Sequence, residues 1–292
     1  MNKITISVII PAYNSGLFLA EAIESVLTQQ NVDVEAIVVN DGSTDNTLEI
    51  ASGFGERIEV ITQKNSGVAA SRNIGAARAK GEYLAFLDAD DIWLPDKLAL
   101  QIQKIQSGFP VVYSNRYNFG QIGDLPLIQS DIMELPEGNI WKLLLSGNMI
   151  TTSSIVIKKE IFEEFDGFNS ELPSCEDWDL WLRCAEKYPI GCCPEPLVKY
   201  RVHPGGISRN YVRMNKMRQL VIQRALTSAK GSALSGQEKR KITAGIWSSS
   251  GWEAAVDKNY CYAFAYYLRA LSFTPFNYRL WYDVARIIAG RV

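Results

Sequence analysis

The feature that most constrains this chain is the alternation of short β-branched segments with helix-like segments over residues 4–87. Ile4–Ile10 is rich in β-branched residues, typical of a buried strand, and Leu17–Gln29 follows with apolar residues at helical intervals. Further strands are expected at 35–39, 58–62 and 83–87, and further helices at 44–52, capped by Ser43 or Thr44, and at 67–79. This alternation predicts an α/β fold with a mostly parallel sheet covered by helices on both faces.

Polar loops follow three of these strands. They are Pro11–Asn14, Asn40–Ser43 and Asp88–Asp91. Because crossover connections place the carboxyl ends of parallel strands along one edge, these loops should meet where ligands of open α/β sheets bind.

Beyond residue 95 the pattern loosens and then becomes wholly helical. We expect a helix at 95–107, a strand at 111–115, an irregular insertion at 116–150, strands at 153–157 and 197–202, and helices at 158–165 and 177–187. Helical spacing then continues at about 210–228, 236–256, 259–272 and 276–289. We therefore expect an α/β domain over residues 1–207 and an all-helical extension over residues 208–292.

The charge of the chain separates at nearly the same place. The net charge is -2, but residues 1–200 hold 15 basic and 28 acidic residues (net -13), and residues 201–292 hold 15 and 4 (net +11). Either the two parts face different partners, or a basic tail packs on an acidic body. His203 is the only histidine, which excludes His-rich metal sites and any enzyme that needs two histidines.

Cysteine usage and hydropathy favour a cytoplasmic protein. The five cysteines form no Cys-X-X-Cys pair, so free thiols in a reducing compartment are expected rather than a zinc site. Pro11, Tyr13 and Asn14 interrupt the uncharged N-terminal run, unlike a signal peptide. No stretch reaches the roughly 18 apolar residues that span a bilayer.

The acidic segment Asp88–Asp91 is the sharpest chemical signal. Three carboxylates within four residues repel one another unless a cation or a ligand's donors offset them. Hard oxygen ligands at a strand end suit Mg²⁺ or Mn²⁺ carrying a diphosphate. The alternative is a solvated turn before the helix that begins near Pro95.

Five ordered motifs resemble those of family 2 glycosyltransferases. They are Ser7–Asn14, Val38–Asp45, Asn65–Asn73, Phe86–Asp91 and Cys175–Asp179. The resemblance covers residues 4–204 and implies the GT-A fold, with a Rossmann-like central sheet flanked by helices. It also implies an inverting, nucleotide-sugar-dependent transferase of hexosyl groups, of the kind used in polysaccharide biosynthesis of the cell envelope.

The same resemblance implies a binding site for the nucleotide-sugar donor. Because members of this family commonly use UDP-sugars, a UDP-sugar is the expected donor. The residues of this site would be Pro11, Ala12, Tyr13, Asp41, Arg72, Asp88, Ala89 and Asp90. Ala12 and Tyr13 would line the base pocket, and Asp41 would accept a hydrogen bond from uracil or ribose. Arg72 would reach the base or the phosphates, although a salt bridge to the acidic loop is the alternative.

The resemblance also implies a divalent cation, Mn²⁺ or Mg²⁺, on the donor diphosphate. In this DXD motif Asp90 would be the main ligand. Asp91 would be either a second ligand or a residue that supports Asp90 without touching the cation. His203 would add a further contact, since neutral imidazole suits Mn²⁺. A structural role for this lone histidine is the alternative.

The family's catalytic base falls in the segment Glu176-Asp177. Asp177 matches the base, with Glu176 as the second choice, and the alternative is that both charges complement a helix dipole. The base would take a proton from an acceptor hydroxyl as that oxygen attacks the sugar from the face opposite the diphosphate. The implied acceptor is a saccharide, free or lipid-linked.

The C-terminal segment is basic and aromatic. Residues 260–282 contain ten Tyr, Phe or Trp, and residues 258–292 hold five basic residues against one acidic residue. Such helices suit a peripheral contact with a membrane on its inner face, although helix packing explains the aromatics equally well.

Other function classes lack their motifs. The chain has no Gly-X-Gly-X-X-Gly after its first strand, no P-loop and no Gly-X-Ser-X-Gly elbow, and we expect no nucleic-acid partner. Two alternatives remain, a catalytically silent nucleotide-sugar-binding scaffold and a nucleotidyltransferase of similar architecture.

Overall fold

A computed structural model describes residues 5–123, 125–203 and 211–289 of the chain. Its contacts divide the chain into two compact units. The first, here called the sheet unit, comprises residues 1–141 and 149–206, and the second, the helical unit, comprises residues 142–148 and 207–292. The domain boundary expected between residues 207 and 208 lies outside the described residues and stays a prediction.

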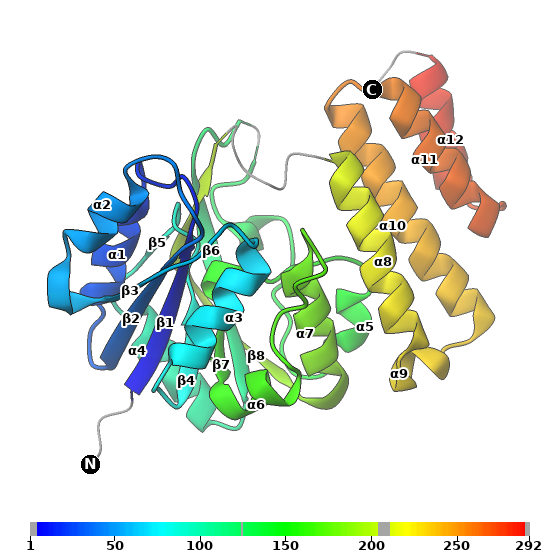
Figure 1. The fold of residues 1–292 in the computed structure, drawn as a ribbon. Coiled ribbons are helices and arrows are strands. Elements are labelled where there is room, and N and C mark those ends of the chain that lie inside the picture. Colours follow the sequence, from blue (N-terminus) through cyan, green and yellow to red (C-terminus); the bar gives the residue numbers. More distant parts are fainter. Residues whose placement is uncertain (1–4, 124, 204–210, 290–292) are drawn as a thin grey trace. The chain divides into compact units, whose positions relative to one another are not determined.

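The sheet unit is built on one eight-stranded mixed sheet in the order β3-β2-β1-β4-β7-β6-β8-β5 (Figure 1). The strands are β1 Thr5–Ala12, β2 Asp33–Asn40, β3 Glu59–Thr62, β4 Tyr83–Phe86, β5 Ile92–Trp93, β6 Val111–Gly120, β7 Val156–Lys158 and β8 Ile190–Val202. Strands β1 to β4 pair in parallel, β7 runs antiparallel to β4 and β6, and β5 runs antiparallel to β8. The expected α/β fold is therefore present.

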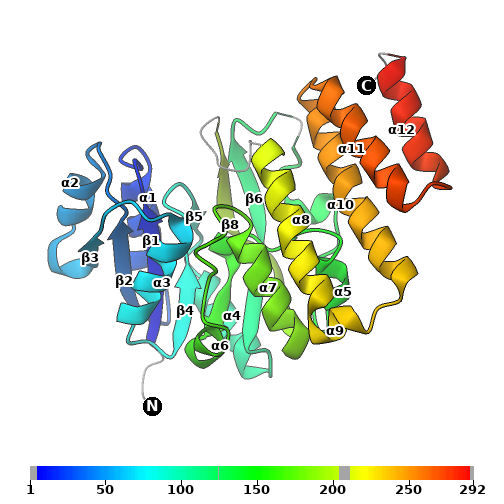
Figure 2. The same cartoon turned by 45° about the vertical axis from the view of Figure 1, so that its right-hand side comes forward.

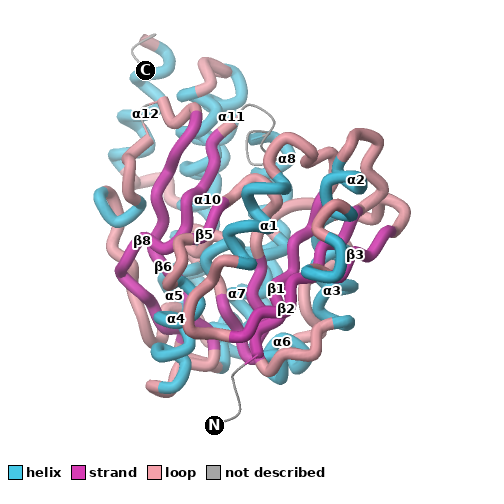
Figure 3. Tube along the Cα trace, turned by 90° about the vertical axis from the view of Figure 1, so that its left-hand side faces the viewer, coloured by secondary structure: helices cyan, strands magenta, loops and turns pink. Residues whose placement is uncertain are grey.

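Helices cover both faces of this sheet. In the sheet unit they are α1 Leu19–Leu27, α2 Thr47–Ser52, α3 Val68–Arg78, α4 Lys97–Gln106, α6 Lys159–Glu164 and α7 Glu176–Lys187, with short 3₁₀ turns at Gly55–Arg57, Gln129–Asp131 and Thr152–Ser154. The short helix α5, Trp141–Leu144, falls mostly within the helical unit. Figure 2 shows α3, α6 and α7 in front of the sheet, and Figure 3 shows α1 and α4 on the other face.

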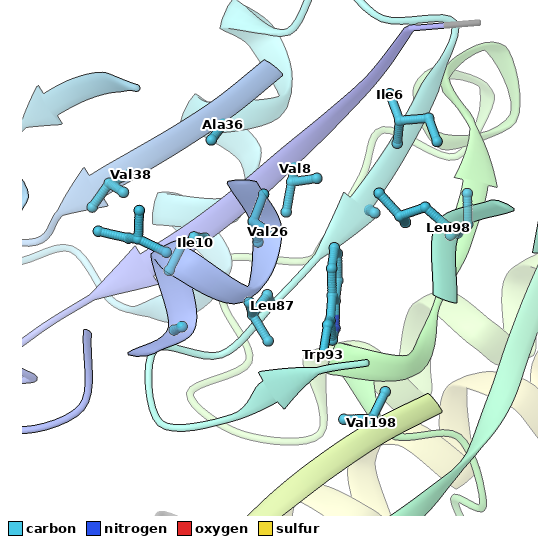
Figure 4. Packing of buried hydrophobic residues seen from close by; sticks show 14 of the residues in the cluster. Ile6, Val8, Ile10, Val26, Ala36, Val38, Leu87, Trp93, Leu98 and Val198 are labelled. Carbon is cyan, nitrogen blue, oxygen red and sulfur yellow. The ribbon is translucent and has the colours of Figure 1, made fainter. Parts of the chain in front are cut away.

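The alternation of side chains along β1 separates the two cores. Ile6, Val8 and Ile10 point toward α1 and α4 and are fully buried (Figure 4). Each such side chain stabilises the fold by about 1.5–3 kcal/mol relative to an exposed position. Ile9 points to the opposite face, where a Cβ on Gly75 would lie 2.5 Å from its Cγ2. A glycine there lets α3 pack closely on the sheet.

The expected extents of β6, β7 and β8 differ from the structure, and β7 begins only at Val156, after the 3₁₀ turn at Thr152–Ser154. The irregular insertion was expected to begin at residue 116, but β6 continues to Gly120 because it pairs in parallel with β8. That partner strand also begins at Ile190, seven residues before the strand expected at 197–202, and includes two prolines that read as loop residues. The pairing between β6 and β8 accommodates these prolines by shifting its register on both sides of Asn115.

The expected start of helix α2 is also wrong. Neither Ser43 nor Thr44 caps this helix, which begins at Thr47 with Asn46 at the N-cap position. The backbone N–H of Thr44 instead donates to Asn14 Oδ1 at 2.8 Å, so this turn ties two strand-end loops together.

The helical unit contains α8 Tyr211–Thr227, α9 Ala229–Ser232, α10 Gly236–Val256, α11 Tyr260–Phe273 and α12 Tyr278–Ile288. The expected all-helical extension is therefore present. Helix α10 begins with a capping box: the Glu238 backbone N–H donates to Ser235 Oγ at 3.2 Å, and the Ser235 N–H donates back to Glu238 Oε2 at 2.9 Å. In the described ranges, no helix combines the length and hydropathy needed to cross a bilayer.

Candidate functional site

The strand-end loops meet at one edge of the sheet, as the alternation predicts. Ala12 lies opposite Asn40 in the β1–β2 register, and the Asp41 N–H donates to the Ala12 carbonyl at 2.8 Å. On the other side of β1, the Leu87 N–H donates to the Ile9 carbonyl at 3.0 Å. The loops expected to bind the donor are thereby adjacent.

The residues expected to line the base pocket differ in exposure. Pro11 and Ala12 are buried within β1, and Ala89 is buried in the acidic loop. Tyr13 is half exposed just beyond the strand. Of this group, Tyr13 therefore presents the largest accessible surface to a ligand.

The carboxylate of Asp41 holds the loop that precedes α3. Its Oδ1 accepts from Gln63 Nε2 at 2.7 Å and from the Ser66 N–H at 2.8 Å, and its Oδ2 accepts from the Gly67 N–H at 2.9 Å. Gly67 has a φ of 89°, which favours glycine. Asp41 thus orders the loop leading to Arg72, and its contact with a nucleotide remains a prediction.

Arg72 joins three segments that are distant in sequence. From α3, its Nη2 donates to Asp88 Oδ1 and its Nη1 donates to Glu176 Oε1, each at 2.6 Å. The side chain is 3% exposed and its guanidinium lies 5.2 Å from the Phe168 ring. Burial alone would lower the pKa of Arg72, but the charges of Asp88 and Glu176 outweigh it and raise that pKa. The salt bridge considered as the alternative is therefore formed.

Asp177 lies at the start of α7, beside this ion-paired group. Its Oδ1 accepts from the Trp178 N–H at 2.7 Å, and its Oδ2 accepts from Thr152 Oγ1 at 3.2 Å. Burial and the nearby charge of Glu176 raise the pKa of Asp177 to about 7, while Arg72 lowers it in part. A carboxylate that exchanges its proton near neutral pH fits a general base.

Glu176 differs from Asp177 in its availability. It is buried and its Oε1 is held by Arg72, whereas Asp177, taken as a whole residue, keeps some exposure to solvent. The preceding residue, Cys175, has a φ of 61°, a left-handed conformation that is costly for a residue with a Cβ. Such strain is typical of functional sites, and here it lies directly before the two carboxylates at the start of α7.

Asp90 and His203 are brought together from loops more than a hundred residues apart. Asp90 Oδ2 lies 2.9 Å from His203 Nε2, and both side chains are partly exposed. Burial and the charge of Asp88 raise the pKa of Asp90, while His203 lowers it in part. A carboxylate and an imidazole are two donors of the kinds that Mn²⁺ and Mg²⁺ accept, so this pair fits a cation whose other ligands come from phosphate or water.

Asp91 is not brought to this pair as a third ligand. It is 1% exposed, its Oδ2 accepts from Ser153 Oγ at 2.6 Å, and its Oδ1 accepts from the Arg201 N–H at 2.8 Å. Burial, followed by the charges of Asp90 and Asp88, raises the pKa of Asp91 well above its usual range. Within the described ranges, no three His, Cys, Asp or Glu side chains are grouped to hold a metal ion.

Several residues that shape this site carried no signal in the sequence. Ser153 accepts from the Asp88 N–H at 3.1 Å and so joins both ends of the acidic loop. Arg201 donates from Nε to the Asp90 carbonyl at 2.8 Å and packs 4.4 Å from both the Phe18 and Phe119 rings. The one available hint for Arg201 was its place two residues before the only histidine.

Comparison with known proteins gives relatives of one kind. A model of the family described as Glycosyl transferase family 2 matches residues 7–165. An uncharacterized glycosyltransferase of Haemophilus influenzae is 33% identical over 230 residues, covering 70% of this chain and 68% of the relative. One from Rickettsia felis is 34% identical over 205 residues, or 68% of this chain and 34% of the relative. The chain thus spans about a third of the length of this Rickettsia relative.

Solved structures share the fold over nearly the whole chain. TarS of S. aureus in complex with UDP-GlcNAc aligns with a TM-score of 0.68 at 19% identity, covering 99% of this chain and 89% of that chain. The mannosyltransferase PcManGT of Pyrobaculum calidifontis, in complex with GDP-Man and Mn²⁺, aligns with a TM-score of 0.61 at 18% identity, covering 97% and 85%. The likeness shows a GT-A fold with C-terminal helices.

Proposed function

Because the chain belongs to glycosyl transferase family 2, we propose that it transfers a sugar from a nucleotide diphosphate donor to a hydroxyl group with inversion at the anomeric carbon. The observation that carries this proposal is Asp177, whose pKa is raised to about 7 and which sits beside the ion-paired Arg72, Asp88 and Glu176 at the carboxyl edge of the sheet. A base near neutral pH at the ligand edge of a GT-A fold fits this reaction.

The donor is a UDP-sugar bound by the strand-end loops. TarS, a structural neighbour, was solved with UDP and with UDP-GlcNAc, and PcManGT was solved with GDP-Man. The residues assigned to the donor are Pro11, Ala12, Tyr13, Asp41, Arg72, Asp88, Ala89 and Asp90. Tyr13 packs on the base. The hydrogen bonds of Asp41 and the ion pairs of Arg72 hold the loops of the donor site in position before the donor binds.

Asp90 and His203 would hold a divalent cation, Mn²⁺ or Mg²⁺, at the donor diphosphate. Such a cation would supply Lewis-acid chemistry that offsets the negative charge of a leaving diphosphate. Asp91 acts behind it: by accepting from Ser153 and from the Arg201 N–H, it fixes the loop that carries Asp90.

Asp177 holds the acceptor hydroxyl and takes its proton. The Trp178 N–H and the Thr152 hydroxyl fix its two oxygens, so that the carboxylate faces the acceptor in one orientation. Arg72 keeps the charge of Glu176 engaged and thereby limits how far the pKa of Asp177 rises. Because the acceptor oxygen attacks the face opposite the diphosphate, a single displacement inverts the anomeric carbon.

The helical unit contributes a peripheral membrane contact for a lipid-linked saccharide acceptor. Aromatic side chains lie exposed at and just before α12: Phe276 is 98% exposed, and Tyr278, Trp281 and Tyr282 are more than half exposed. Exposed arginines accompany them at positions 279 and 286. Aromatic rings and arginines on one amphipathic helix suit the headgroup region of an anionic bilayer.

A donor screen tests the proposed activity. Purified protein with Mn²⁺ or Mg²⁺ is incubated with UDP-, GDP- and dTDP-sugars, with and without an acceptor panel, and the released nucleotide is measured by chromatography. We expect release of UDP from one UDP-sugar, abolished by EDTA. Binding without release on any acceptor would instead support the silent scaffold, and pyrophosphate formation from a nucleoside triphosphate would support the nucleotidyltransferase.

A further inference from the structure

Arg116 on β6 is a partly buried cation that forms no ion pair with a carboxylate among the described residues. Its Nη1 donates to Thr151 Oγ1, and its guanidinium lies 4.3 Å from the centre of the Tyr200 ring. Its Nε is buried and makes no hydrogen bond in the described part of the chain. Arg72 and Arg201, the other arginines close to the site, each contact at least one carboxylate.

An arginine in this state favours an anion. Burial lowers the pKa of Arg116, and the nearby Tyr200 and Asp91 offset this only in part. Hydroxyl and aromatic contacts offset only part of the cost of removing a cation from water. The planar guanidinium offers several parallel N–H donors, and these match the two oxygens of a phosphate or a carboxylate.

The position of Arg116 relates it to the acceptor side of the site. It follows the irregularity at Asn115, where the pairing of β6 with β8 shifts register, and such bulges redirect side chains beside active sites. Its hydrogen-bond partner Thr151 directly precedes Thr152, whose hydroxyl donates to Asp177 at 3.2 Å. Arg116 is thus linked to the base through two consecutive residues of one turn.

We propose that Arg116, oriented by Thr151, binds an oxyanion of the acceptor, a phosphate or carboxylate carried close to the hydroxyl that Asp177 deprotonates. The proposal rests on the function proposed above, because it places the acceptor at Asp177. The acceptor is accordingly an anionic saccharide or a phosphate-bearing one. The diphosphate of the donor is the other anion that Arg116 could bind, and a binding experiment distinguishes it from an anionic group on the acceptor.

The experiment uses glycerol 3-phosphate as the probe and glycerol as its uncharged match. Both are titrated by calorimetry into the full chain, first alone and then saturated with UDP and Mn²⁺, so that the diphosphate position is filled. The variant is Arg116→Met, and the control is Arg78→Met, which removes an exposed arginine paired with Glu59. We expect glycerol 3-phosphate to bind wild type and Arg78→Met equally and Arg116→Met about tenfold more weakly or worse, with UDP affinity unchanged.

Three results would overturn the proposal: no binding of glycerol 3-phosphate to the wild type, equal binding to Arg116→Met, or a loss of UDP affinity in that variant with phosphate binding intact. The last would assign the guanidinium to the donor. Should Arg116→Met fail to fold, Arg116→Lys and Thr151→Val replace it, and each should weaken phosphate binding by a smaller factor. A wild type that binds no UDP contradicts the proposed function instead, and the titration without UDP still decides the role of Arg116.

Discussion

The two units of this protein treat charged side chains in opposite ways. The sheet unit buries several, including Arg72, Asp91, Lys97 and Glu176, and engages each with a polar partner. In the described part of the helical unit, the buried polar side chains are Asn215 and Ser250, and no charged side chain is buried. The charged side chains described in the helical unit are partly or fully exposed, and so are large aromatic rings on α12.

This contrast fits the different functions proposed for the two units. Burying charges is costly, and it is tolerated where fixed charges must meet a ligand whose own charge changes during a reaction. An exposed basic and aromatic face costs little in folding and suits attachment to another surface. Changes in the sheet unit should therefore act on catalysis and folding, and changes in the helical unit should act on attachment.

Removing the base gives the largest expected effect. Asp177→Asn keeps the shape of the side chain but cannot accept a proton, so kcat should fall by about 10²–10⁴, with the Kd for UDP unchanged. The matched control is Asp257→Asn at the exposed end of α10, which should leave kcat at the wild-type value. Steady-state transfer assays and calorimetry measure the two quantities, and near-normal turnover by Asp177→Asn would refute the assignment of the base.

Removing one ion pair from each unit compares how much each pair contributes to the free energy of unfolding. Arg72→Met leaves Asp88 and Glu176 without their cation in a buried setting and should lower the free energy of unfolding by about 3–5 kcal/mol. Arg218→Met removes the more exposed pair with Glu253 and should cost less than about 1 kcal/mol. Urea denaturation of both variants tests this, and equal losses would show that burial does not distinguish the two pairs.

The pH dependence separates the units again. Because Asp177 must be deprotonated to act as a base, and its pKa is about 7, kcat should rise about tenfold from pH 6 to pH 8 and then level off. Vesicle binding by the helical unit should stay constant over this range, since arginine remains charged. A rate profile that is flat between pH 6 and pH 8 would contradict the raised pKa.

The smallest effect is expected on attachment. The double variant Trp281→Ala, Tyr282→Ala should bind vesicles containing phosphatidylglycerol about fivefold more weakly, while transfer to a soluble acceptor stays unchanged. Flotation with anionic and with neutral vesicles measures the binding. If the wild type floats equally with both, or with neither, the aromatic face of α12 has another purpose.

The local patterns of the sequence predicted much of the fold. Strands β1 to β4, helices α1, α3 and α4, and the long helices of the helical unit all lie within a few residues of the expected ranges. Such patterns suffice because apolar periodicity and turn residues act over a few positions. The edge at which the loops meet also followed, since the connections of a parallel sheet dictate it.

What the sequence by itself determined is the identity and order of the elements and the loops that bear polar groups. The tertiary structure alone decided the partner of each buried group: Arg72 with Asp88 and Glu176, Asp91 with Ser153, and Arg116 beside Thr151. It also decided the full length of β6 and β8, whose pairing joins segments about eighty residues apart. The physical reason is that these contacts join segments that are far apart in sequence, and no local pattern encodes the distance between them. Once such groups are buried, the charge of each partner determines whether the other keeps its own charge.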